Sequence, residues 1–555
     1  MERLGHYAYM WRGRIALAGL VVAIAAAIGG ASVFDAVSPY GFQDPDSESA
    51  RATEALEDAT GERPLPDVVL IVDPRGEDGL ASAAKRAERE LRTVPDVTTV
   101  AGPDDDPELV SEDGRLGIVV GYLDADTEDI SEVGKTVEQR FSDVDDIVTG
   151  GAAVTQHQLN KTTEDDLRRI ELFAAPILFL LSLLVFRGLV AATLPLVVGV
   201  LSIVTTLLVL RLLTEIIAID VFVINIVTGL GLGLAIDYSL FVISRFREQL
   251  AGGAPTGAAV RKTVGSQGRM ILFSGLTVAA ALASLCIFPQ RFLYSIGVGG
   301  AVVALTSALV CLTLLPALLA MLGPRVNALA PRRLQVHPTD RRWRAWGRFV
   351  LRHPGAIAAV VVVAMVAAGL PFLRVELTRA DATTLPADSS ARRVDSLLQN
   401  RFTSDPASRV TVVLTEPPGP RAFAQARRKL AALPAVEDVE RLAPTGDVRR
   451  IDVQLVVKPF SDKALDAVEA ARGLSWGAPA LVDGPPAELR DQRDSLGDHL
   501  PTALAIIVLS TLVLIFAMTG SLVLPFLALL MNALTVSVAF GVLVFIFQDG
   551  RLEGL

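Results

Sequence analysis

The chain has 555 residues, of which 51% are hydrophobic and only 20% are charged, and its mean hydropathy is +0.46. This composition excludes an ordinary soluble protein and predicts membrane spans that alternate with water-soluble domains. The formal net charge of −10 argues against a nucleic-acid partner, which would require a basic surface.

Nine apolar segments are each close to the length that a helix needs to cross a bilayer, about 20 residues. They are 15–34, 170–186, 189–213, 217–243, 270–289, 293–322, 355–373, 500–518 and 521–547. Three arginines (Arg3, Arg12 and Arg14) precede the core of the first segment, so a signal peptide is an alternative there. The rest of the architecture favours a retained anchor.

Basic residues predict the orientation of these spans. Arginine and lysine gather between the fourth and fifth spans and again in the segment 323–354. The positive-inside rule then places both segments and the N-terminus in the cytoplasm, and the long polar segments 35–169 and 374–499 outside. Binding of anionic lipid headgroups is an alternative explanation for the charge of 323–353, but the topology already accounts for it.

The predicted organisation therefore has eight parts. They are the N-terminal segment with the first span (1–34), a first extracytoplasmic domain (35–169), spans two to six (170–322), a basic linker (323–354), the seventh span (355–373), a second extracytoplasmic domain (374–499), spans eight and nine (500–547) and a short C-terminal tail (548–555).

The two outer segments repeat each other. SARATEAL (Ser49–Leu56) matches SARRVDSL (Ser390–Leu397), DVVLIVD matches RVTVVLT, and VPDVTTV matches LPAVEDV. Each unit is predicted to run helix, strand, helix, strand. Parallel repeats of this kind are typical of transporters. Spans four to six have no counterpart in the second half, so we expect a chain that lacks the last three spans of a duplicated transporter.

Asp237 lies in the apolar run of the fourth span, roughly 12 Å before Arg245 by helical rise. A charge at that depth is unfavourable unless it faces protein or trapped water, and such a carboxyl group is suited to exchanging protons. Gly229 and Gly233 precede it on the same side and would let another helix approach. Tyr238 adds a hydroxyl, and Ser274 is a further polar contact. The alternative is that Asp237 is a structural hydrogen-bonding group between helices.

No motif for catalysis, nucleotide binding or metal binding is present. The sequence contains no G-x-x-x-x-G-K-[ST] phosphate loop, its five histidines lack metal-ligand spacing, and Cys286 and Cys311 lie in apolar runs. His157 and His499, with the aspartates near them, are interpreted as polar stems that lead into spans. We therefore expect a protein that is not an enzyme, that holds no cofactor or metal, and that draws energy from an ion gradient.

The segment GLGLAIDYSLFVISRFREQL resembles the fourth transmembrane helix of the mycobacterial membrane protein large (MmpL) family, in the resistance–nodulation–division superfamily. FPQRFLYSI, LGPRVNAL and LVLPFLALLMNALTVSVAFGVLVFIFQDG also look like this family, so the resemblance covers nearly the whole chain. Secretion proteins of the superfamily tend to follow the aspartate with Ala-Asn, whereas Tyr238 and Ser239 follow it here. This favours the lipid-exporter branch.

The resemblance implies a helical membrane protein with two α+β porter domains of split βαβ type that hold a lipid or lipid-like substrate. It implies that Asp237, Tyr238 and Ser274 form a proton relay, with Gly229 and Gly233 packing around it. Family members carry a second Asp-Tyr pair in a tenth span, before which this sequence ends. The implied function is proton-driven export of envelope lipids, glycolipids or hydrophobic compounds across a bacterial plasma membrane, with membrane lipids and envelope accessory proteins as partners.

Two alternatives remain open at this point. One is a membrane scaffold or ligand sensor that uses its outer domains without transporting anything. The other is a protein-export accessory of the same superfamily.

Overall fold

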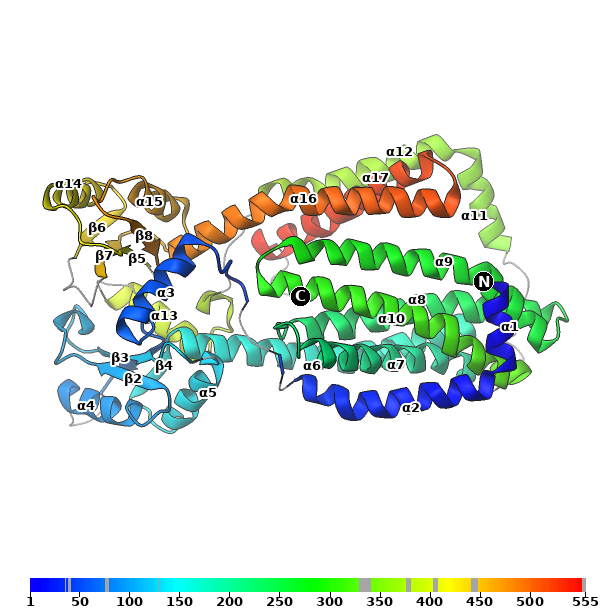
Figure 1. Ribbon diagram of the computed structural model, residues 1–555, viewed down its shortest axis with the longest axis horizontal. Coiled ribbons are helices and arrows are strands. Elements are labelled where there is room, and N and C mark those ends of the chain that lie inside the picture. The colour runs from blue at the N-terminus through cyan, green and yellow to red at the C-terminus, as the bar shows by residue number, and fades with distance from the viewer. Residues whose placement is uncertain are drawn as a thin grey trace. The chain divides into compact units, whose positions relative to one another are not determined.

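The computed structural model describes residues 1–34, 36–37, 41–74, 79–127, 129–328, 341–375, 381–402, 408–440 and 448–551. The chain divides into two compact units (Figure 1). The helical unit comprises Met1–Ser38, Leu172–Leu377 and His499–Leu555, and the outer unit comprises Pro39–Glu171 and Thr378–Asp498.

The described part of the chain contains eight helical segments that are long and apolar enough to cross a membrane. They are α2 (Arg12–Gly30), α7 (Leu189–Leu213), α8 (Val223–Ala251), α9 with η3 (Thr256–Ile287), α10 with η4 (Arg291–Asn327), α12 with η6 (Pro354–Arg374), α16 (Pro485–Thr519) and α17 with η9 (Val523–Gln548). Two further helices of this unit, α1 (Glu2–Met10) and α11 (Arg341–Arg352), are polar or amphipathic.

The predicted span 170–186 differs from the other eight. It is the end of α6 (Ala152–Phe186), a single helix of 35 residues whose first half is polar. By sequence its apolar end follows Glu171, and among the described residues Pro176–Phe186 forms a shorter apolar helix. The span 170–186 therefore stays a prediction.

Helix α8 packs against α7, α9 and α10 around a core that includes Val242, Phe246 and Ile271. Small residues allow these helices to approach closely. A Cβ atom added to Gly275 on α9 would lie 2.9 Å from the Cβ of Ala308 on α10. Membrane helices gain little from hydrophobic burial against each other, so such close van der Waals packing is what holds them together.

In the first half of the outer unit, four strands form an antiparallel sheet in the order β2-β3-β1-β4. The strands are β1 (Val68–Val72), β2 (Val97–Ala101), β3 (Gly117–Leu123) and β4 (Ile147–Gly150). Helices α4 (Leu80–Leu91) and α5 (Ile130–Phe141) cover one face with alanine, leucine and valine side chains. Every residue of β1 is buried, because the other face of the sheet is also covered.

The second half repeats this fold in the order β6-β7-β5-β8. Its strands are β5 (Arg409–Leu414), β6 (Val436–Val439), β7 (Arg449–Leu455) and β8 (Ala480–Asp483), with α14 (Pro420–Ala431) and α15 (Asp462–Arg472) on one face. Both halves run βαββαβ, with the hairpin strand inserted between the two parallel strands, which confirms the predicted split βαβ domains.

The two halves exchange a helix. Helix α3 (Glu48–Thr60), from the first segment, packs on β5 and β8 through Ala52 and Leu56, beside Val413. Helix α13 (Ser390–Arg401), from the second segment, packs on β1 and β4 through buried apolar side chains such as Val394. Each sheet thus gains a second covered face from the other half (Figure 1), and the duplicated helices SARATEAL and SARRVDSL occupy equivalent positions.

Polar contacts fix α3 in its exchanged place. Arg472 bridges Glu48 on α3 and Asp491 on α16, at 3.1 Å and 2.7 Å. The amide of Ser49 donates to Asp491 over 2.8 Å, and the amide of Val482 donates to Glu48 over 2.9 Å. The exchange is therefore held by charge-assisted hydrogen bonds as well as by apolar burial.

We expect Arg472→Met to destabilise the outer unit by about 2–3 kcal/mol, because it leaves the partly buried carboxylates of Glu48 and Asp491 without their cation. Hydrogen exchange in α3 of the whole solubilised protein measures this effect. The matched control is Arg490→Met, which removes solvent-exposed ion pairs to Asp494 and Glu469 and should change stability by less than about 1 kcal/mol. Equal effects of the two variants would contradict the assigned role of Arg472.

Candidate functional site

Helix α8 carries the predicted site on 29 residues without proline. Its charged C-terminal end is anchored by side chains: Arg247 donates to the backbone oxygen of Phe186 and to Asn327, the latter over 2.7 Å, and Arg245 pairs with Glu248 at 2.6 Å. Asp237 lies two turns before these cations, within the apolar part of the helix. The helix therefore holds Asp237 at a fixed depth relative to its charged end.

The predicted site residues lie on two different faces of α8. Gly229, Gly233 and Asp237 follow each other at four-residue spacing and are all exposed. A Cβ atom added at either glycine would have no described heavy atom, outside its own helix, within 4 Å. The described residues thus leave this stripe uncovered, and the close helix contact expected at the glycines is not made by them.

Tyr238 points the other way and is only 4% exposed. Its hydroxyl reaches Ser274 on α9, where it donates over a long 3.5 Å. Gly275, next in the chain, allows α9 to lie near enough for this contact. The structure therefore brings Tyr238 on α8 and Ser274 on α9 together. Asp237, next to Tyr238 in the chain, lies on the exposed face of α8.

Two further buried polar groups, one on α8 and one before its first residue, were not predicted. Ser239 is fully buried and lies 3.8 Å from the sulfur of Cys311 on α10. Asp220 is also fully buried, accepts from the amide of Phe222 over 3.0 Å, and its own amide donates to Ser295. Asp220 lies in the turn that precedes α8, two residues before the N-cap residue Phe222.

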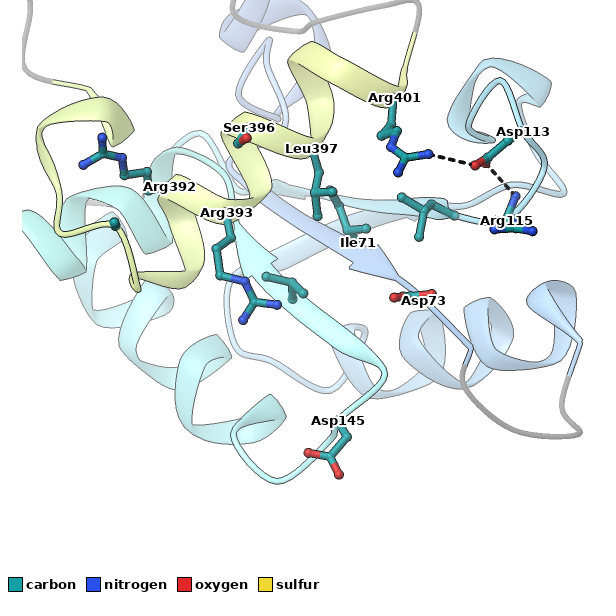
Figure 2. A pocket seen from close by; sticks show the side chains of 13 residues that line it. Ile71, Asp73, Asp113, Arg115, Asp145, Arg392, Arg393, Ser396, Leu397 and Arg401 are labelled. Atoms are coloured by element: carbon teal, nitrogen blue, oxygen red, sulfur yellow. Dashed lines mark hydrogen bonds and ion pairs between the residues drawn. The ribbon is translucent and has the colours of Figure 1, made fainter.

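The outer unit contains a groove of about 540 Å³ between α13 and the first sheet (Figure 2). Its apolar lining includes Ile71, Leu116, Val148 and Leu397, and its charged lining consists of four arginines (Arg115, Arg392, Arg393 and Arg401) and three aspartates (Asp73, Asp113 and Asp145). Arg401 pairs with Asp113 at 3.0 Å. An apolar lining edged by charged groups of both signs is chemically suited to an amphiphilic molecule with a polar head.

Two buried carboxyl groups lie where the halves of the outer unit meet. Burial raises the pKa of Asp67 to about 6, although Arg63 lies 3.0 Å away. Burial, together with the nearby charge of Glu488, raises the pKa of Asp483 to about 7. Thr53 on the exchanged helix α3 donates to Asp483 over 2.9 Å. Sequence analysis missed both groups, since each flanks a strand and resembles an ordinary surface aspartate.

These features define a class of protein. A bundle of membrane-spanning helices joined to two split βαβ domains with exchanged helices, and a carboxylate on an apolar central helix, is the architecture expected of the resistance–nodulation–division type. The model of the MMPL family matches residues 41–357 and 434–555. The chain belongs to the MMPL family.

The relatives that the chain resembles agree with this assignment. The chain is 33% identical to membrane protein SCO6666 of Streptomyces coelicolor over 537 residues, which cover 95% of this chain and 74% of that protein. It is 31% identical to the trehalose monomycolate exporter MmpL3 of Mycolicibacterium smegmatis, covering 98% of this chain and 60% of the exporter. It is 27% identical to MmpL11 of the same organism, an exporter of mycolic acid-containing lipids, covering 93% of this chain and 57% of MmpL11.

The chain is thus a multi-pass membrane protein of a family of transporters, not of enzymes. It spans about 60% of the length of the two mycobacterial exporters named above. At the level of the family, the relatives support lipid export.

Proposed function

We propose that the protein exports lipids or lipid-like hydrophobic molecules across the bacterial plasma membrane, driven by proton entry. The observation that carries this proposal is the carboxylate of Asp237 on α8, a membrane-spanning helix with no other acidic residue before its charged end. A carboxyl group in an apolar span can alternate between charged and neutral forms as protons pass.

In this proposal Asp237 binds and releases the proton. The hydroxyl of Tyr238, held near Ser274 at 3.5 Å, supplies the adjacent polar path on α9. Gly229 and Gly233 leave room beside Asp237 for a further helix or for water. Protonation of Asp237 removes the charge from the stripe formed by Gly229, Gly233 and Asp237. The neutral stripe can contact apolar neighbours that the charged stripe cannot, and this change links proton movement to helix movement.

The outer unit would receive the exported molecule. The groove beneath α13 combines an apolar lining with four arginines and three aspartates, which supports an amphiphile with a polar head. The lipids named for MmpL3 and MmpL11 are amphiphiles of this kind, and this similarity extends the proposal to envelope lipids and glycolipids.

The orientation is part of the proposal. Arginine and lysine concentrate after α8 and in 323–354, which favours cytoplasmic placement of these segments and of the N-terminus. The outer unit then lies outside the membrane, where it would deliver lipids to envelope accessory proteins.

Export can be tested in spheroplasts that express the whole protein and are fed a radiolabelled lipid precursor. Labelled lipid extracted from the outer surface by albumin is expected to rise with expression and to fall to background when an uncoupler collapses the proton gradient. Expression without any rise in extractable lipid, or a rise that survives the uncoupler, would refute proton-driven export.

A further inference from the structure

Helix α11 (Arg341–Arg352) has an unusual composition that neither the packing of the fold nor the proposed transport cycle explains. Its twelve residues, RRWRAWGRFVLR, hold five arginines and three aromatic residues and no acidic residue. The positive-inside rule explains the charge of this segment but not its aromatic residues. The positions of the aromatic residues on the helix are therefore an observation independent of the charge.

Three arginines and two aromatic residues of α11 lie on different sides of the helix. Arg344, Arg348 and Arg352 are spaced by four residues and are exposed, so they share one side of the helix. Trp346 and Phe349 stack with ring centroids 5.6 Å apart on the other side, and Phe349 meets the ring of His353 at 5.6 Å. The helix therefore has one cationic face and one aromatic face.

The aromatic face is left uncovered by the described residues. Trp346 is 57% exposed and Phe349 is 49% exposed. Exposure of two stacked aromatic rings to water is unfavourable, and an apolar medium on that side would bury them.

The position of α11 in the chain indicates what that medium is. Only His353 separates α11 from α12, a membrane-spanning helix that begins at Pro354. By helical rise, Trp346 is roughly 12 Å of chain from the start of this span. The bilayer surface is therefore close to the part of α11 that carries Trp346 and Phe349.

We propose that α11 lies in the membrane surface and binds anionic phospholipids. Its aromatic face enters the boundary between headgroups and acyl chains, and Arg344, Arg348 and Arg352 contact lipid phosphates. This combination of an aromatic face and an arginine face is typical of helices that lie in the plane of a bilayer. Arginines close to an anionic bilayer surface are attracted to it. The proposal does not depend on lipid export by the same protein.

Amide hydrogen exchange of residues 344–352 tests the proposal in the chain as it exists, reconstituted in nanodiscs of phosphatidylcholine alone or mixed with phosphatidylglycerol. We expect exchange to be roughly tenfold to a hundredfold slower with phosphatidylglycerol, since two or three arginines gain a phosphate partner. Added salt should reduce this difference, because it screens the charges. Equal exchange in the two lipid compositions would overturn the proposal.

Variants separate the two faces. Replacing Arg344, Arg348 and Arg352 by glutamine keeps helix propensity and should abolish the difference between the two lipid compositions. Trp346→Gln with Phe349→Gln should speed exchange in both compositions. Arg261→Gln with Lys262→Gln, on exposed positions of α9, is the matched control and should leave α11 unchanged. A difference that persists in the triple arginine variant, or that disappears in this control, would overturn the assignment to α11.

Discussion

Replacing Asp237 by asparagine is expected to reduce proton-driven lipid export by the whole protein on the order of a hundredfold, while the protein remains folded. Asparagine has the same size and remains polar, but it cannot take up and release a proton. Because Asp237 is exposed on α8 and its side chain is not part of the buried core, its replacement should not disturb the packing of α8 against α9 and α10. The measurement is the rate of lipid extraction from spheroplasts at equal protein level.

Glu248→Gln is the matched control for this prediction. It removes a carboxylate from the same helix, but one that is exposed at the charged end and pairs with Arg245 at 2.6 Å. Such a surface pair contributes less than about 1 kcal/mol. Export should therefore persist in Glu248→Gln. If Asp237→Asn exported lipid at the rate of this control, Asp237 would have only a structural role.

The second large effect concerns the stability of the outer unit as pH changes. The pKa of Asp483 is about 7 in the folded protein, above its ordinary value of 3.8, because burial disfavours the charged carboxylate. At pH values between 3.8 and about 7, Asp483 is therefore protonated in the folded state but has released its proton in the unfolded chain. Stability should fall as pH rises from about 4 to about 7 and then stay level. Asp67, with a pKa of about 6, acts in the same direction up to that pH.

Asp483→Asn removes the buried ionisable group, keeps an acceptor for the hydroxyl of Thr53 and should stabilise the outer unit by about 2 kcal/mol at pH 8. At pH 4 the variant and the original protein should be nearly equal. Hydrogen exchange in β8 of the whole solubilised protein measures the difference. Asp462→Asn, at an almost fully exposed carboxylate of the same unit, should have no comparable effect. A variant that is less stable than the original protein at pH 8 would show that the charged form of Asp483 is favoured.

Much of the outer unit could be predicted from the sequence. The β-branched runs at 67–73 and 409–415 become the central strands β1, which is fully buried, and β5, which is buried except at Arg409, and the repeated SAR segments become equivalent helices. The exchange of α3 and α13 could not be predicted. An amphipathic pattern shows which face of a helix is apolar, but two similar sheets offer equally suitable surfaces for it.

The carboxyl groups of Asp67 and Asp483 were missed for the same reason. Their burial depends on the exchanged packing and not on any local pattern. In the membrane part, the Asp-Tyr pair was recognised on an apolar helix, but the sequence could not show that Tyr238 faces the core while Asp237 lies on the uncovered side. Neighbouring helical positions differ by roughly 100°, so adjacent residues commonly face different environments.

The most direct test of the central claim is to record proton and lipid movement in the same vesicles. The whole protein is reconstituted into liposomes that trap a pH-sensitive dye, a proton gradient is imposed, and lipid transfer to albumin is followed together with internal pH. The account predicts that lipid transfer and proton flux rise together in the original protein and that both stop in Asp237→Asn. Lipid transfer that continues in Asp237→Asn, or that proceeds without proton flux, would contradict it.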